Sequence, residues 1–228
     1  MKVVIPAKAN STRVINKNWR PFDGKDSLVD VKITQLRKAG FKAKDIYVSS
    51  DDYRELLQVK QRHNVQILRR SPDLCDNSAS LQQLMRSTKE QMPPTGTIAW
   101  CQVTSPSFNE YVGCLEAWAL HQHDHDSLCV AFPTSPYRLT PHKQTYQPTG
   151  WSFGSHHRSS QDLGPSYSMP FAFSILTEQC IRKHGYYIGA KPYWYLAKES
   201  HIDIDTVDDF FDASAVYASR KTRTPRDR

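Results

Sequence analysis

Short apolar runs alternate with amphipathic stretches along most of this chain. The runs are typical of buried strands, because they hold consecutive aliphatic and aromatic residues and end at polar ones. They lie at 3–5, 46–50, 65–68, 97–101, 127–132 and 169–176, with a further candidate at 193–196. Stretches with helical spacing separate them, at 30–39, 53–63, 79–91, 109–121, 177–184 and 208–218. The alternation predicts an α/β fold with a doubly wound, mostly parallel sheet.

Residues 133–167 interrupt this alternation. The segment is rich in Pro, Gly, Ser, His and aromatic residues, and it is too long to be a simple connection in a compact domain. We interpret it as an insertion that serves as a lid or an oligomer arm. The rest of 1–218 then forms a single α/β domain. The basic end, 219–228, lacks apolar anchors and is expected to be disordered.

The composition narrows the class of protein. Hydrophobic residues make up 39% and charged residues 23% of the 228 residues, which suits a soluble globular protein. No apolar run approaches the length of a membrane span, and the N-terminus lacks a signal-peptide pattern. The five Cys are scattered without a CxxC pair, so we expect free thiols and a cytoplasmic protein.

The net charge of +7 is compatible with nucleic-acid binding. Several of the cations, however, lie in the first loop and in the last residues of the chain. An anionic small substrate accounts for the remaining excess as well as a polymer does. We therefore predict neither a nucleic-acid nor a membrane partner.

The loop that follows the first strand combines small residues with cations. Lys8, Arg13 and Lys17 are interspersed among Ala, Ser, Thr and Asn residues. Small residues let backbone N–H groups approach phosphates, and the cations offset phosphate charge. The loop is neither a Walker A loop nor a GxGxxG motif. A solvated surface loop has the same composition, so the loop alone leaves both interpretations open.

Other polar residues follow the predicted strands, and ligands of open parallel sheets bind at the carboxyl ends of the strands. These residues are Asp51, Asp52, Arg69, Arg70, 102–105, Asp203 and Asp205. On extended backbone, the carboxylates of Asp203 and Asp205 point the same way, and Mg²⁺ takes one or two carboxylates together with phosphate oxygens. This set suits a Mg²⁺-bound nucleoside triphosphate. The alternative is an acidic cluster before a helix, with Thr206 or Asp205 as its N-cap.

Several motifs, in order along the chain, are similar to those of one enzyme family. The pattern IPARxGSKxIPxKN corresponds to residues 5–18, and a strand ending in STDD to 48–52. The pattern RPxxLAxDxAS is similar to 70–80, LQPTSP to 101–106, RxQDLPxxY to 158–167 and DIDTxEDF to 203–210. The chain resembles the cytidylyltransferases that make CMP-activated acidic sugars, namely the CMP-sialic acid, CMP-pseudaminic or legionaminic acid and CMP-Kdo synthetases.

The resemblance implies a Rossmann-like nucleotidyltransferase fold, CTP and an acidic sugar as substrates, and Mg²⁺ as cofactor. It also implies a homodimer in which the insertion reaches the partner's site. It assigns nucleotide contacts to Lys8, Asn10, Ser11, Arg13, Asn18, Arg70 (or its neighbour Arg69) and Ser80. It assigns sugar contacts to Gln102, Ser105, Arg158, Gln161 and Tyr167. The metal ligands are Asp203 and Asp205, which act in catalysis together with Lys8.

The chain departs from the family pattern at several positions. Lys8 stands for the loop Arg, Ala9-Asn10 for the first Gly pair and Thr12 for the loop Lys, while Pro170-Phe-Ala-Phe-Ser174 replaces the sugar-pocket motif NGxxYI. The insertion motif favours a nine-carbon α-keto acid sugar over Kdo. Two alternatives stay open: another sugar nucleotidyltransferase or GT-A-like glycosyltransferase, and a catalytically weakened homologue that acts as a binding protein.

Overall fold

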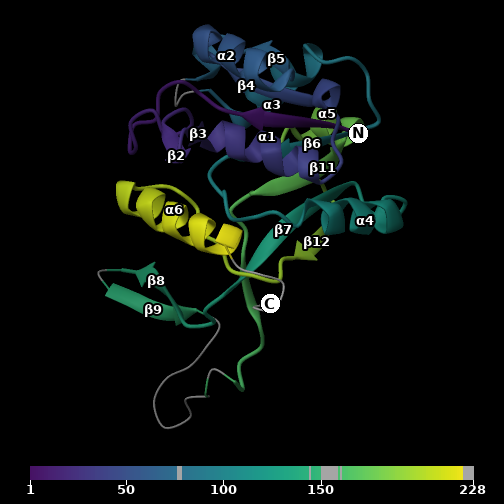
Figure 1. Ribbon diagram of the computed structural model, residues 1–228. Coiled ribbons are helices and arrows are strands. Elements are labelled where there is room, and N and C mark those ends of the chain that lie inside the picture. Colours follow the sequence, from purple (N-terminus) through teal and green to yellow (C-terminus); the bar gives the residue numbers. More distant parts are fainter. Residues whose placement is uncertain (76–78, 144, 150–158, 160, 223–228) are drawn as a thin grey trace.

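A computed structural model describes residues 1–75, 79–143, 145–149, 159 and 161–222 of the chain. It confirms the predicted α/β class, with helices on both sides of a central sheet (Figure 1). The sheet contains β1 (Lys2–Pro6), β4 (Ile46–Ser50), β5 (Gln66–Arg69), β6 (Thr97–Cys101), β7 (Ser127–Thr134), β10 (Ser166–Ser168), β11 (Phe173–Thr177) and β12 (Pro192–Leu196). The helices are α1 (Leu28–Lys38), α2 (Tyr53–His63), α3 (Leu81–Glu90), α4 (Tyr111–His121), α5 (Glu178–His184) and α6 (Val207–Thr222).

The strand order is β10-β7-β11-β6-β1-β4-β5, and β12 pairs with β7. The pairs β1–β4, β1–β6, β4–β5 and β12–β7 are parallel, which makes the sheet mostly parallel as predicted. The single strand predicted at 169–176 is wrong in detail. It is replaced by β10 and β11, and β11 lies antiparallel between β6 and β7.

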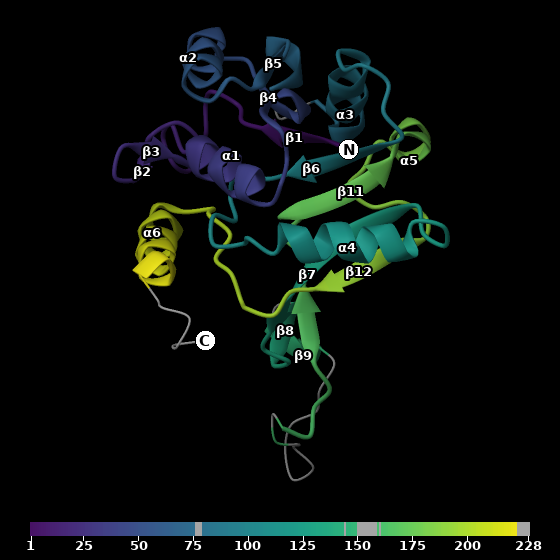
Figure 2. The same cartoon turned by 45° about the vertical axis from the view of Figure 1, so that its right-hand side comes forward.

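Alternate residues of β1 face two separate cores, which explains why Val3, Val4 and Ile5 are all apolar. Val3 and Ile5 belong to a large cluster with buried residues of α1, α2 and α4. Val4 belongs to a smaller cluster that includes Met85 of α3 and Ile181 of α5. Figure 2 shows α1 and α4 lying along the same side of the sheet. A strand buried on both faces is typical of doubly wound folds.

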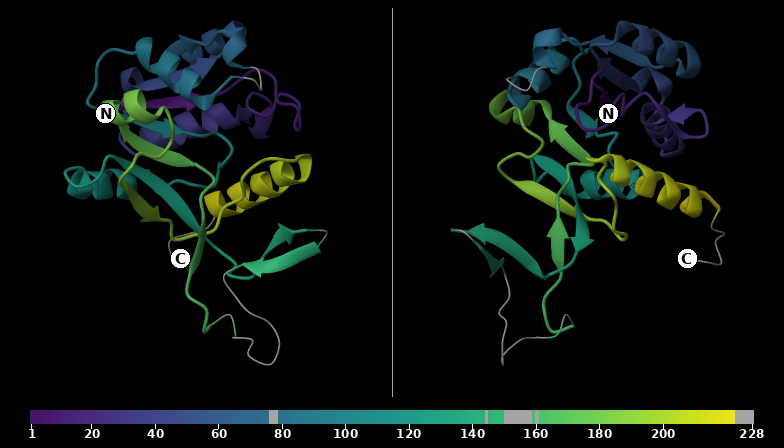
Figure 3. Two further views of the ribbon diagram at one scale, coloured as in Figure 1. Left: turned by 180° about the vertical axis from the view of Figure 1, so that it is seen from behind. Right: turned by 90° about the vertical axis from the view of Figure 1, so that its left-hand side faces the viewer.

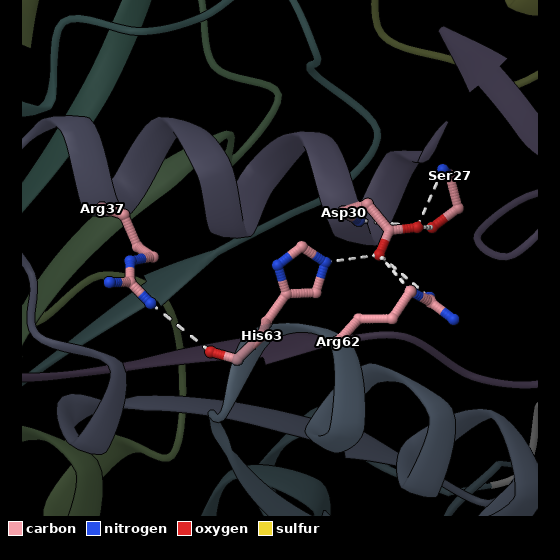
Figure 4. Close-up of polar contacts among 5 residues, drawn as sticks. All are labelled: Ser27, Asp30, Arg37, Arg62 and His63. Atoms are coloured by element: carbon pink, nitrogen blue, oxygen red, sulfur yellow. Dashed lines mark hydrogen bonds and ion pairs between the residues drawn. The ribbon is translucent and has the colours of Figure 1, made fainter. Parts of the chain in front are cut away.

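Helices α1 and α2 are joined through one buried carboxylate (Figure 4). Asp30 accepts hydrogen bonds from Ser27 N (2.9 Å) and from Arg62 Nη2 (2.9 Å), and its Oδ1 lies 2.7 Å from His63 Nε2. Ser27 Oγ in turn accepts from Asp30 N (3.2 Å), which completes a capping box at the start of α1. These contacts stabilise the layer that supports the first loop.

The predicted insertion contains the hairpin of β8 (Arg138–His142) and β9 (Thr145–Thr149), which forms its own small sheet. Figures 1 and 3 show this hairpin lying apart from the central sheet. Helix α6 extends to Thr222, so the first residues of the predicted disordered end are helical. Arg220 accounts for this, because it donates to Ser107 O (3.1 Å) and pairs with Glu199 (3.0 Å). No helix in the described ranges is long and apolar enough to cross a bilayer.

Candidate active site

The loop of residues 7–18 follows β1, and hydrogen bonds between its backbone and two side chains hold it in place. Ala9 N donates to Asp51 Oδ1 (2.8 Å) at the end of β4, and Asn18 Nδ2 donates to Lys8 O (2.9 Å). The Asn18 side chain is almost fully buried, with 5% of its surface exposed. The loop is thus fixed at both ends.

A pocket of about 240 Å³ opens beside this loop at the carboxyl ends of β1 and β6. Its lining includes the predicted site residues Lys8, Ser11, Arg13, Asn18, Arg70 and Gln102. Thr12, Lys17, Leu84, Val103, Thr104 and Tyr187 also line it, together with Pro6 and Val14. The structure therefore brings together residues that the sequence placed at separate strand ends. The lining carries more cations than a neutral ligand requires, and it suits an anionic one.

Arg70 is the most deeply buried cation of this pocket, with 6% of its surface exposed. Its Nη2 donates to Ser49 O (3.3 Å), its Nη1 lies 4.0 Å from Cys75 Sγ, and its Nε has no hydrogen-bond partner in the described chain. No described carboxylate forms an ion pair with it. Arg69, the alternative, is exposed and lies over the ring of Tyr53. The geometry favours Arg70 as the ligand-facing residue.

The segment 203–205 lies against the same loop. Arg13 Nη2 is 2.7 Å from Asp205 Oδ1, and Lys17 Nζ donates to the carbonyl oxygen of Ile204. Ile204 N donates to Thr104 O (2.9 Å), which ties the segment to the pocket wall. Residues more than a hundred positions apart in sequence therefore meet at the mouth of the pocket.

Asp203 has one carboxylate oxygen without a hydrogen-bond partner among the described residues, although its side chain also bonds to Thr104. Its Oδ1 is buried without a hydrogen bond in the described chain, and burial raises the pKa of its carboxyl group above the ordinary value. Neighbouring Asp205 adds to this rise through like charge. The capping alternative is also realised, but by Thr206, whose Oγ1 accepts from Asp209 N (3.2 Å). Asp203 and Asp205 are therefore not needed as caps of α6.

The two carboxylates fit a Mg²⁺ ion as far as their chemistry goes. Mg²⁺ binds proteins through one or two carboxylates and completes its shell with water and phosphate oxygens. A buried, unpaired oxygen of Asp203 beside exposed Asp205 provides such a pair. No group of three or more His, Cys, Asp and Glu residues suited to a metal occurs among the described residues. A metal at this position would thus need phosphate oxygens from a substrate.

Lys17 is a site residue that the sequence did not single out. It lines the pocket, and burial lowers its pKa below the ordinary value, although Asp205 and Asp203 oppose this shift. Its place among the loop cations was visible in the sequence. Its contact with Ile204 was not, because that contact depends on the folding back of a distant segment.

The far wall of the pocket is aromatic. Gln102 Nε2 donates to the hydroxyl oxygen of Tyr187 (2.8 Å), and the Tyr187 ring lies 6.2 Å from that of Trp100. Burial raises the pKa of Tyr187 to about 12, so its hydroxyl stays protonated at neutral pH. Tyr187 was not predicted as a site residue, because it lies in a connection without a recognisable motif. The pocket thus has a cationic end and an aromatic, hydrogen-bonding end.

Comparison with known proteins agrees with this geometry. The sequence model of a family described as cytidylyltransferase matches residues 2–128, which carry most of the pocket lining. The chain belongs to the cytidylyltransferase family. Its members include the group that the motifs resemble, so the predicted family is confirmed.

Relatives of known function extend the match. N-acylneuraminate cytidylyltransferases of Streptococcus agalactiae serotypes V and III are each 24% identical over 216 residues, covering 91% of this chain and 51% of theirs. The chain spans about half the length of the curated relatives it matches. Among solved structures, CMP:2-keto-3-deoxy-manno-octonic acid synthetase complexed with CTP has a TM-score of 0.67 at 11% identity, covering 96% of this chain and 98% of that one.

A second solved structure is 2-C-methyl-D-erythritol 4-phosphate cytidylyltransferase from Thermus thermophilus. It has a TM-score of 0.62 at 12% identity, and the match covers 96% of this chain and 98% of that one. These structures establish the nucleotidyltransferase fold of this cytidylyltransferase-family chain. Their low identities carry no further information on its substrate.

Not every predicted site residue lies at the pocket. Ser105 is fully buried and does not line the pocket, and its backbone carbonyl oxygen accepts from Lys32 Nζ (2.6 Å). Ser80 caps α3 by accepting from Gln83 N (3.2 Å). Asn10 is exposed on the loop and does not line the pocket.

The insertion residues lie elsewhere still. Arg158 is outside the described residues. Gln161 is exposed, and Tyr167 lines a separate apolar cavity with Met169, Trp194 and Leu196. Neither Gln161 nor Tyr167 lines the cationic pocket of the same chain. Their predicted contact with a sugar therefore remains a prediction, and it requires a second chain.

Proposed function

We propose that this protein is a CTP-dependent cytidylyltransferase that activates an acidic α-keto sugar of the nonulosonic type and releases pyrophosphate. The observation that carries the proposal is the cationic pocket formed by Lys8, Arg13, Lys17 and Arg70 near Asp203, whose buried Oδ1 has no hydrogen-bond partner among the described residues. Membership of the cytidylyltransferase family supports CTP as the nucleotide. The 24% identical N-acylneuraminate cytidylyltransferases support the class of sugar.

In the proposed reaction, the triphosphate lies along the loop of residues 7–18. Lys8, Arg13 and Lys17 offset its charge, and the unfilled donors of Arg70 bind a carbonyl or hydroxyl oxygen of the nucleoside. Mg²⁺ held by Asp203 and Asp205 would supply positive charge to the phosphate oxygens. Arg13, which pairs with Asp205 at 2.7 Å, would move to the phosphates when the nucleotide binds.

The chemical step is an in-line displacement at the α-phosphate. The anomeric hydroxyl oxygen of the sugar forms a bond to the α-phosphorus and releases its proton. The bond between the α-phosphorus and the bridging oxygen breaks, and pyrophosphate leaves with the electron pair. Cations near the leaving group stabilise this charge more in the transition state than in the ground state. The products are CMP-sugar and pyrophosphate.

The same proposal includes a homodimer. Tyr167 and Gln161 lie outside the cationic pocket of their own chain, so a role in sugar binding requires that the insertion of one subunit approaches the pocket of another.

The five cysteines are free thiols, which fits a reducing compartment such as the cytoplasm.

The direct test is pyrophosphate release with CTP, Mg²⁺ and a panel of acidic sugars. We expect turnover with at least one nine-carbon α-keto acid and less with Kdo. Asp203→Asn keeps the size of the side chain but removes its charge, so it should fold normally and lose at least about 100-fold in kcat, a loss of about 2.7 kcal/mol in transition-state stabilisation.

Asp73→Asn is a matched control, because Asp73 is an exposed carboxylate outside the pocket lining. It should retain the parent rate. Parent-like turnover of Asp203→Asn across a Mg²⁺ titration would remove the proposed metal site. Tight CTP binding without pyrophosphate release for any sugar would instead favour the alternative of a catalytically weakened binding protein, which the replacement of the loop Arg by Lys8 keeps open.

A further inference from the structure

Phe171 has an unusual backbone conformation next to the aromatic wall of the pocket. Its φ angle is +60°, in the left-handed region. Bulky side chains rarely adopt this region, whereas Gly does so without steric cost. The other described non-Gly residues with positive φ are Asn16, Asn64 and Lys143.

The neighbouring pairing fixes the position of Phe171. Gln102 N donates to the carbonyl oxygen of the next residue, Ala172 (3.0 Å), and Phe173 pairs with Cys101 in the ladder between β11 and β6. Phe171 therefore lies beside the end of β6, from which Gln102 enters the pocket. A strained residue persists only where its surroundings determine its conformation, and such residues concentrate at functional sites.

The ring of Phe171 continues the aromatic wall. Its centroid lies 4.8 Å from that of Tyr187 and 5.7 Å from that of Tyr186. Tyr187 lines the pocket and accepts the hydrogen bond from Gln102 at 2.8 Å. Phe171 thus packs against the residue that presents both an apolar ring and a hydroxyl group to the ligand. It does not itself line the pocket.

We propose that Phe171 is a positioning residue that determines acceptor specificity by fixing Tyr187 and its bond to Gln102. The inference rests on the proposed function and concerns the sugar end of the site. The fixed wall would take a polyhydroxylated acceptor with one apolar face. That face packs on the Tyr187 ring, and an oxygen of the acceptor bonds to the remaining donor of Gln102. CTP lies at the cationic end and does not depend on Phe171.

The test compares Phe171→Gly with Phe171→Leu. Gly relieves the backbone and removes the ring, so Tyr187 gains freedom. Leu keeps an apolar side chain against the wall. We expect Phe171→Gly to raise the acceptor KM at least about tenfold and to broaden the range of accepted sugars. The KM for CTP should change less than about twofold, and kcat at saturating acceptor should change little. Phe171→Leu should lie between the parent and the Gly variant.

Acceptor binding is measured separately through the fluorescence of Trp100, whose ring lies 6.2 Å from that of Tyr187. Phe211→Gly serves as control, because Phe211 is an exposed aromatic on α6, outside the pocket lining. Thermal unfolding shows whether each variant is folded. If Phe171→Gly does not fold, the acceptor KM of Phe171→Leu relative to that of the parent tests the inference instead.

The outcomes separate this inference from the proposed function. Turnover by the parent with an unchanged acceptor KM in the folded Phe171 variants overturns the inference and leaves the proposed function intact. If the parent binds an acidic sugar but releases no pyrophosphate, the proposed activity fails. The ratio of sugar affinities between parent and variant then still decides the role of Phe171. If no acidic sugar binds to the parent, both proposals are wrong.

Discussion

At the scale of single residues, burial with an unpaired Nε distinguishes Arg70 from the other cations of the pocket. Arg13 has a carboxylate at 2.7 Å, and Lys17 donates to a backbone carbonyl. Arg70 has only a carbonyl at 3.3 Å and a distant sulfur, and its Nε is unpaired within the described residues. A buried guanidinium with unfilled donors is costly for the folded state, so an anionic or carbonyl-bearing ligand would offset that cost.

Arg70→Met removes the charge and retains most of the volume. We expect the free energy of unfolding to stay unchanged or to rise by about 1 kcal/mol, because an uncompensated cation is replaced by an apolar side chain. The affinity for CTP should fall at least about tenfold, because hydrogen bonds to charged groups contribute about 1.5–3 kcal/mol. Calorimetric titration with CTP and chemical denaturation measure the two effects.

Arg69→Met is the control for this prediction. Arg69 is exposed over the ring of Tyr53, at 5.4 Å from its centroid, and its replacement should leave CTP affinity unchanged. A loss of stability in Arg70→Met together with parent-like CTP binding would make Arg70 a structural residue. The Arg69 control would then show whether the alternative register of the motif is correct.

At the scale of elements, the sequence predicted the periodic segments and missed features that depend on distant pairing. Helix α2 was predicted with its observed bounds, Tyr53–His63, and in the structure Asp52 caps it and Asn64 ends it in the left-handed conformation. The hairpin β2 (Pro21–Asp23) and β3 (Asp26–Ser27) was missed, because strands this short carry no periodic signal. The antiparallel direction of β11 was also missed, since a strand's direction is decided by its neighbours.

The candidate site was predictable to a similar extent. Residues that follow a strand directly, such as Lys8 and Gln102, were found because a parallel sheet gathers its strand ends at one edge. Tyr187 was missed because it reaches the pocket from the connection after α5, through a bond to Gln102. Nothing in the sequence indicated that Ser105 would be fully buried, with its carbonyl oxygen accepting from the buried Lys32. Contacts of this kind leave no local pattern in the sequence.

The contact between α1 and α2 allows a prediction of stability. Burial alone would raise the pKa of Asp30, but the hydrogen bonds from His63, Ser27 and Arg62 outweigh it and hold the pKa well below the ordinary value. Asp30→Asn should lower the free energy of unfolding at pH 7 by about 2 kcal/mol, through loss of charged hydrogen bonds and a weaker cap. Chemical denaturation measures the change.

The sign of the pH dependence follows from the depressed pKa. The stabilisation by Asp30 is fully present above the pKa of an unfolded Asp, about 4, and is lost as the pH falls below it toward the folded value. The difference in free energy of unfolding between the parent and Asp30→Asn should therefore be constant from pH 7 to about 5 and should shrink at lower pH. Asp26→Asn, an exposed neighbour, should show no such difference. If this difference in free energy of unfolding did not change with pH, the charge of Asp30 would not be what stabilises the contact between the two helices.

At the scale of the whole molecule, an apolar surface lies where the insertion joins the sheet. Ala131, Tyr167, Met169, Trp194 and Leu196 line a cavity of about 520 Å³ together with Ser168. Trp194 is 44% and Leu196 49% exposed, although both lie on a strand of the central sheet. Contiguous exposed apolar surface of this kind marks interaction sites. We therefore expect this surface to be the centre of the proposed homodimer interface.

Trp194→Glu places a charge at the centre of this surface. We expect the dimer dissociation constant to rise at least about 30-fold, because a large aromatic at the centre of an interface contributes about 2 kcal/mol or more. The isolated chain should stay folded, since the side chain already faces solvent in part. Sedimentation velocity over a range of concentrations measures the change in mass. Leu120→Glu is the control, because Leu120 is 76% exposed on α4 and should leave the dimer intact.

The same variant separates nucleotide binding from turnover. Trp194 does not line the cationic pocket, so monomeric Trp194→Glu should bind CTP with parent affinity. The predicted sugar contacts Gln161 and Tyr167 do not line that pocket, so in the proposed homodimer they would act on a partner's substrate. Dissociation should therefore raise the KM for the acidic sugar and reduce pyrophosphate release, and both should recover as protein concentration restores the dimer. A monomer with parent-like sugar KM would show that each chain carries a complete site, and it would remove the insertion from the mechanism.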